Sequence, residues 1–164
     1  MALSAEAEAR IVAELGKYPT RRSALLPALK LAQHDQHVLR PETLARVAEL
    51  VGVSHAAANE LATFYSMLAT EQQGRKVVEV CVQLPCALQG ADELLQRLAQ
   101  DLGIAPGETT ADGEVTLLRT HECFGSCQKA PMCLLNHEYR ENLRGEAVER
   151  LLAELRAPAL AESA

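Results

Sequence analysis

The sequence has few of the features that an enzyme needs to bind a nucleotide by itself. Its 164 residues include no tryptophan, and only 3% of them are aromatic. Its nine glycines form neither a G-x-G-x-x-G turn nor a phosphate-binding loop, the usual signals for dinucleotides and nucleoside triphosphates. No paired catalytic acid and base is evident. We therefore expect no catalytic residue in this chain and no nucleotide-dependent oxidation by the chain alone.

Long apolar runs and a basic N-terminus are also missing. No stretch approaches the roughly 20 apolar residues that a membrane-spanning helix needs, so we expect no direct insertion into a membrane. Residues 4–8 after Met1 are small or acidic, which is unlike a secretory signal. A reducing cytoplasm is therefore expected, and two disulfides are disfavoured there.

The charge distribution argues against a nucleic acid partner. The formal net charge is -6, and nearly all of the excess acid lies in residues 75–164, with 14 acidic against 9 basic residues. A helix-turn-helix over residues 41–68, as in a DNA-binding sensor, is an alternative. However, residues 54–70 hold no lysine or arginine to contact phosphate.

Four of the five cysteines come as two close pairs. Cys81 and Cys86 form a C-x4-C pair, and Cys123 and Cys127 form a C-x3-C pair. Neither is the C-x2-C of a thioredoxin-type dithiol or of a typical zinc knuckle. Four thiolates suffice for a 2Fe-2S cluster, and four-cysteine zinc remains an alternative. The cysteines therefore favour a metal centre, with iron-sulfur ahead of a zinc-stapled interaction module.

The hydrophobic period changes near Gly74. Before it, serine and proline at helix starts and glycine at helix ends predict a bundle of four helices. These predicted helices cover residues 4–16, 23–33, 41–52 and 54–68. We expect residues 1–74 to form an N-terminal helical bundle.

After Gly74 the pattern mixes strands and helices. Strands are predicted over 77–82, 115–118 and 132–135, and helices over 92–102 and 146–155, with a frayed tail over 158–164. Each cysteine pair follows a strand end and lies on a loop, so the two pairs could converge. Residues 75–164 are therefore predicted to form an α/β domain that carries the cysteines.

Several stretches carry a family resemblance. Residues 22–29, 62–65, 107–113, 122–127 and 130–131 resemble, in this order, the thioredoxin-like 2Fe-2S subunit of bacterial and mitochondrial NADH:quinone oxidoreductase, respiratory complex I. The similarity runs from about residue 9 to residue 155. Related chains also serve in NAD-linked formate dehydrogenases and hydrogenases, which stay as alternatives.

This resemblance implies a fold, a cofactor and partners. The fold would be α+β, a helical bundle followed by a thioredoxin-like α/β ferredoxin domain. One 2Fe-2S cluster would be held by Cys81, Cys86, Cys123 and Cys127. FMN and NADH would lie on a partner subunit, which the bundle helps to dock, and further iron-sulfur subunits of the peripheral arm would complete the surroundings. The chain would be a cytoplasmic electron-transfer subunit, associated with the inner membrane through the complex.

Residues near the two cysteine pairs are not expected to bind the metal centre. Cys133 is a fifth thiol, which we expect to be a buried apolar residue and not a ligand. His121 has no ligand place to fill, because four cysteines are present, and is expected on a strand beside the site. Glu122 should lower the cluster potential, whereas Lys129 and the backbone N–H groups around Gly125 should raise it.

Overall fold

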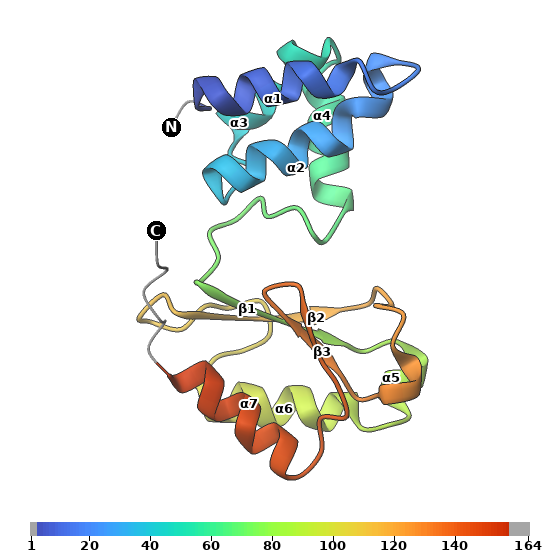
Figure 1. The fold of residues 1–164 in the computed structure, drawn as a ribbon. Helices are drawn as coiled ribbons and strands as arrows, with labels where there is room; N and C mark the ends of the chain where they lie inside the picture. The colour runs from blue at the N-terminus through green and yellow to red at the C-terminus, as the bar shows by residue number, and fades with distance from the viewer. Residues whose placement is uncertain (1–2, 158–164) are drawn as a thin grey trace. The chain divides into compact units, whose positions relative to one another are not determined.

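The computed structural model describes residues 3–157 and divides the chain into two units (Figure 1). Contacts within the chain separate Met1–Gln72 from Gln73–Ala164. The sequence placed the domain boundary after Gly74, and independent folding of the two parts stays a prediction. The predicted tail over 158–164 lies outside the described residues. Among those residues, no helix has the length and apolar character needed to cross a membrane.

Unit 1 is helical. The helices predicted from Ser4, Pro41 and Ser54 begin where the sequence placed them, whereas the helix predicted over 23–33 spans Leu25–Gln36 and follows a 3-10 turn. Ser4 and Ser54 each accept a hydrogen bond from the backbone N–H three residues on, and Pro41 starts a helix that Gly52 ends in the left-handed conformation. The elements are α1 (Ala5–Leu15), a 3-10 turn (Arg21–Ala24), α2 (Leu25–Gln36), α3 (Pro41–Val51) and α4 (His55–Phe64).

Apolar faces and polar links between helices hold unit 1 together. Ile11, Leu29 and Val47 are fully buried in one core cluster, which excludes water from the centre of the bundle. Asp35 accepts hydrogen bonds from the backbone and the hydroxyl of Ser4, which joins the start of α1 to the end of α2. The bundle core therefore has polar links at its edge and apolar packing inside.

The fourth helix is shorter than predicted. It ends at Phe64, whereas the sequence pattern continued to Leu68. Gln33 explains the difference, because its amide oxygen accepts from the Ala69 N–H at 2.6 Å and its amide nitrogen donates to the Met67 carbonyl at 2.9 Å. These contacts from α2 turn the chain, so Leu68 is buried without being helical.

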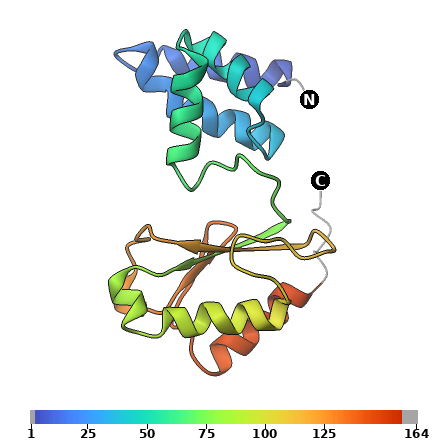
Figure 2. The same ribbon diagram turned by 180° about the vertical axis from the view of Figure 1, so that it is seen from behind.

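Unit 2 is a mixed sheet with helices on one face. Its elements are β1 (Lys76–Cys81), α5 (Leu84–Ala87), α6 (Ala91–Leu102), β2 (Val115–Thr120), a 3-10 turn (Cys127–Lys129), β3 (Cys133–Leu135), β4 (Glu138–Arg140) and α7 (Glu146–Arg156). The strand order is β2-β1-β3-β4, with β1 parallel to β2 and the other neighbours antiparallel. Figures 1 and 2 show α6 and α7 on the same face of the sheet. The predicted α+β, thioredoxin-like fold is confirmed.

The core of unit 2 lies between the sheet and these two helices. Val78 and Val80 of β1 and Leu117 of β2 are fully buried, and Leu98 of α6 and Leu152 of α7 complete the same cluster. Successive strand residues point to opposite faces, so the buried valines alternate with Glu79. This packing fixes the parallel pair β1–β2, whose carboxyl ends precede the cysteine loops.

Lys76 closes the end of α7 against the sheet. Its ammonium donates to the carbonyls of Glu154 at 3.0 Å and Leu155 at 2.9 Å, and also to the carbonyl of Ala157. The last carbonyls of a helix have no partner inside it and carry partial negative charge. A cation at the start of β1 therefore stabilises the C-terminus of the last helix.

Two details of unit 2 differ from the sequence prediction. Cys86 lies on the one-turn helix α5 and not on a loop, because Pro85 favours the first turn of a helix. Strand β4 was not predicted at all. Asn136 and His137 have φ values of 49° and 68°, which a two-residue hairpin turn requires and which asparagine tolerates. Asn136 between apolar and aromatic residues was the signal for this hairpin.

Candidate metal centre

The register of β1 and β2 brings the two cysteine pairs to one edge of the sheet. Cys81 ends β1 and is the register partner of Thr120, which ends β2. Because the strands are parallel, their carboxyl ends meet at the same edge. The segments that follow touch, since Gln83 donates to the His121 carbonyl and the Cys81 thiol lies 3.5 Å from the Glu122 carbonyl.

The first pair is buried. Cys81 and Cys86 are each 1% exposed, and a hydrogen bond links the two thiols. Burial raises the pKa of Cys86 to about 12, and the hydrogen bond and charge of Cys81 act in the same direction. A thiolate in this position is therefore costly unless a cation compensates its charge.

The second pair lies closer to solvent. Cys123 is exposed and Cys127 is half-buried, and their sulfur atoms are 3.4 Å apart. The Gly125 N–H donates to the Cys123 sulfur at 3.4 Å, which lowers the pKa of that thiol. Gly125 has a φ of +81°, a conformation that suits glycine and lets this N–H point back at the sulfur. The hydrogen bond with Cys123 raises the pKa of Cys127, and burial adds to this rise.

The two pairs act on one another electrostatically. Cys123 and Cys127 both raise the pKa of Cys86, and Cys81 raises that of Cys127. Four thiolates would repel each other, and bound metal ions are the usual compensation, because metals bind the deprotonated thiol. Within residues 3–157, no three His, Cys, Asp or Glu side chains gather around one metal position. The donors come as two pairs, and four thiols are the set of sulfur donors that would hold a 2Fe-2S cluster.

A carboxylate from beyond β4 holds the second cysteine loop. Glu141 accepts one hydrogen bond from the Ser126 hydroxyl and another from the Lys129 ammonium at 2.6 Å. Lys129, then Ser126, lower the pKa of Glu141, so the carboxylate is ionised at neutral pH. The Tyr139 hydroxyl also donates to the Phe124 carbonyl at 2.7 Å. Tyr139 and Glu141 were not predicted as site residues, because the hairpin that brings them to the loop was not predicted.

The ammonium of Lys129 is paired with Glu141. Its predicted effect on the cluster potential stays a prediction. His121 lies after the end of β2 and not on the strand, and its ring contacts the Arg119 guanidinium at 2.7 Å.

Cys133 belongs to the core. It is fully buried in β3 opposite Val80, and burial raises its pKa to about 12. The charged groups that act on it are Arg140, Glu154 and Glu79, and no other cysteine is among them. Its predicted burial is confirmed, and its exclusion from the ligand set remains a prediction.

Known proteins are similar to this chain over most of its length. The family model described as "Thioredoxin-like [2Fe-2S] ferredoxin" matches residues 11–156. An NADH-quinone oxidoreductase subunit from Rhizobium meliloti is 42% identical over 147 residues, covering 90% of this chain and 87% of that protein. NADH-quinone oxidoreductase subunit 2 of Thermus thermophilus is 40% identical over 144 residues, covering 86% of this chain and 79% of that protein.

Solved structures agree on the fold. A chain of an NAD+-reducing [NiFe]-hydrogenase in the H2-reduced state superposes with a TM-score of 0.70 at 24% identity. The match covers 82% of this chain and 22% of the hydrogenase chain, so it extends only to the fold. Because the family model spans nearly the whole chain and relatives reach 42% identity, this chain belongs to the thioredoxin-like 2Fe-2S ferredoxin family.

Proposed function

We propose that this chain is an electron-transfer subunit of NADH:quinone oxidoreductase, with one 2Fe-2S cluster held by Cys81, Cys86, Cys123 and Cys127. The observation that carries the proposal is the convergence of the two thiol pairs at the carboxyl ends of β1 and β2. Family membership supports the cluster, and the names of the relatives support the complex.

The site has a buried side, formed by Cys81 and Cys86, and an exposed side at Cys123. When bound, the cluster supplies a centre that takes up and releases one electron at a time. Cys81 and Cys86 exclude water from their side, because both are 1% exposed. Cys123 reaches the surface of unit 2, so this side is open to a partner. The Gly125 N–H points at the Cys123 sulfur and stabilises negative charge on it.

The partner would provide the nucleotide chemistry. The chain has no recognisable nucleotide or flavin motif, so FMN and NADH are assigned to the neighbouring subunit, and further iron-sulfur subunits would continue the route. Within the complex the chain would lie at the cytoplasmic side of the inner membrane. The purified chain should bleach reversibly with dithionite, and NADH should reduce it only after the flavin subunit is added.

Two alternatives differ in what they predict. A place in an NAD-linked formate dehydrogenase or hydrogenase would use the same cluster with other partners, and identification of the largest subunits that co-purify separates this case. A zinc-stapled interaction module would be colourless, since zinc has no charge-transfer band, whereas ferric thiolates absorb visible light. An absorption spectrum of the purified chain therefore distinguishes iron from zinc.

Cysteine substitution tests the ligand assignment. We expect Ser in place of Cys81, Cys86, Cys123 or Cys127 to abolish the visible spectrum or reduce it severely. Cys133→Ser is the matched control and should keep about two irons and two acid-labile sulfides per chain. Iron and sulfide analysis with visible absorption measures both outcomes. A normal cluster in Cys127→Ser, together with its loss in Cys133→Ser, would reverse the assignment.

A further inference from the structure

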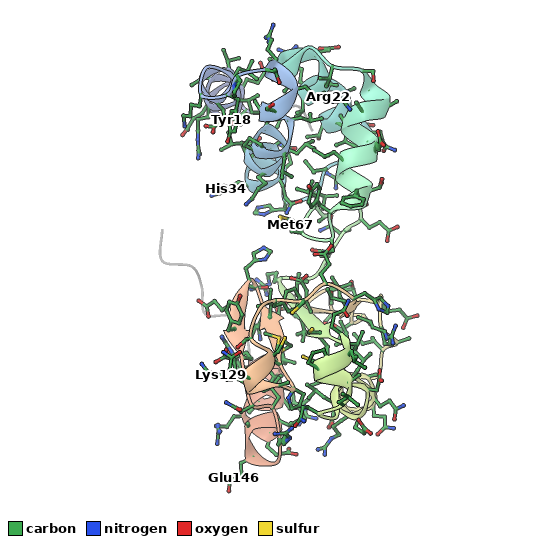
Figure 3. All side chains as sticks on the ribbon, turned by 90° about the vertical axis from the view of Figure 1, so that its right-hand side faces the viewer. Tyr18, Arg22, His34, Met67, Lys129 and Glu146 are labelled. Atoms are coloured by element: carbon green, nitrogen blue, oxygen red, sulfur yellow. The ribbon has the colours of Figure 1, made fainter. Side chains whose placement is uncertain are left out.

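The carboxylate of Glu141 forms hydrogen bonds with the second cysteine loop on both sides of Cys127. Glu141 accepts from Ser126, which precedes this cysteine, and from Lys129, which lies two residues beyond it. Lys129 is labelled in Figure 3. The two donors bind different oxygens of the carboxylate, so Glu141 fixes both at once.

Backbone contacts hold Glu141 in this position. The Asn142 N–H donates to the Lys129 carbonyl at 2.8 Å, and the Leu143 N–H donates to the Pro131 carbonyl at 2.9 Å. Ser126 is 6% exposed, and the Glu141 side chain is 23% exposed. The carboxylate is thus partly shielded from water, where its charge acts more strongly than on an open surface.

Three consequences of this arrangement act in the same direction on a neighbouring cluster. Reduction adds negative charge, which cations and hydrogen-bond donors stabilise and which nearby anions oppose. Glu141 adds a negative charge and pairs with the ammonium of Lys129. It also accepts the hydrogen bond of the Ser126 hydroxyl, which is then not available to the cluster. Each effect makes an additional electron less favourable.

We infer that Glu141 is a positioning residue that lowers the reduction potential of the centre by withholding Lys129 and Ser126 from it. This inference rests on the proposed function, because it requires Cys123 and Cys127 to be cluster ligands. It assigns the control of the potential to a residue outside the ligand loops, contributed by the segment that follows β4.

The test compares two substitutions that each remove one carboxylate charge. We expect Glu141→Gln in the full chain to shift the midpoint potential to a more positive value and to change the spin signal of the reduced cluster. Glu138→Gln is the control, because Glu138 is 74% exposed and pairs with Arg140. It should leave both measurements unchanged. A potentiometric titration followed by electron spin resonance gives both values.

A third variant decides the case if Glu141→Gln loses its cluster. Lys129→Gln leaves the Glu141 charge uncompensated, so the potential should shift to a more negative value. An unchanged potential in Lys129→Gln, or equal shifts in Glu141→Gln and Glu138→Gln, would overturn the inference. If the unsubstituted chain binds no iron, the proposed function fails as well. If it binds a normal cluster and the variants do not shift the potential, only this inference fails.

Discussion

The two units of this chain are stabilised by contacts of different range. In unit 1, caps such as Ser4 and Ser54 act within one helical turn, and the helices then pack through apolar faces. In unit 2, β1 must pair with β2 and β3, which come much later in the chain. The difference indicates that local sequence can specify the bundle, whereas the sheet depends on contacts between distant segments.

The units also differ in where their reactive groups lie. All five cysteines belong to unit 2, and the two pairs surround the carboxyl ends of β1 and β2. Both units expose large apolar side chains, including Phe64 of unit 1, which is 74% exposed, and Leu88 of unit 2, which is 75% exposed. The chemistry therefore depends on unit 2, and docking to the flavin subunit is the role we expect for unit 1.

Separating the units should have the largest effect. A fragment of residues 73–164 should keep its iron and its visible spectrum but show no detectable binding to the flavin subunit at micromolar concentration. The fragment begins at Gln73 because the Gly74 N–H donates to the Thr116 hydroxyl at 2.6 Å. Iron analysis and a binding titration against the full chain measure the two properties. An insoluble or cluster-free fragment would mean that the bundle completes the core of unit 2.

Truncating one buried leucine in each unit sharpens the comparison. Leu29 of α2 and Leu98 of α6 are both fully buried, so each substitution by alanine should lower the free energy of unfolding of its own unit by about 2–5 kcal/mol. Only Leu98→Ala should speed the loss of the cluster, because Leu98 packs in the core that holds β1.

Urea titrations followed by hydrogen exchange measure the stability of each unit, and the decay of visible absorption measures cluster loss. Equal cluster loss in the Leu29→Ala and Leu98→Ala variants would show that the units do not behave independently.

Acid should weaken the surface link between Ser4 and Asp35 in unit 1, which is the smallest effect. The hydroxyl of Ser4 holds the pKa of Asp35 down at about 2, below its ordinary value of 3.8. Since the folded state lowers this pKa, the stabilisation is present above about pH 4 and is lost as the pH falls towards 2. Hydrogen exchange of the α1 amides at pH 5 and pH 3 measures it. Asp35→Asn should remove this part of the pH dependence, and an unchanged pH dependence in that variant would contradict the prediction.

Much of the bundle and part of the sheet could be predicted from local signals. The start of α3 at Pro41 and its end at Gly52 agree with the sequence pattern, since both residues act on their own backbone. The predicted end of α4 at Leu68 was wrong, because the side chain of Gln33 in α2 forms hydrogen bonds with the backbone of Met67 and Ala69. Strand β4 is only three residues long, so its periodic signal was too short, and the turn at Asn136 was not recognised.

The sequence by itself indicated the candidate ligands of a metal centre, because the thiols of each pair are close in the chain and thiolates are the usual ligands of a 2Fe-2S cluster. It also indicated the family, through motifs spread from residue 22 to residue 131. The tertiary structure decided which groups meet. The parallel register of β1 and β2 brings Cys81 near the loop that follows Thr120. The β3–β4 hairpin delivers Glu141 to Ser126 and Lys129. Neither contact has a local signal, because each joins segments that only the packed sheet brings together.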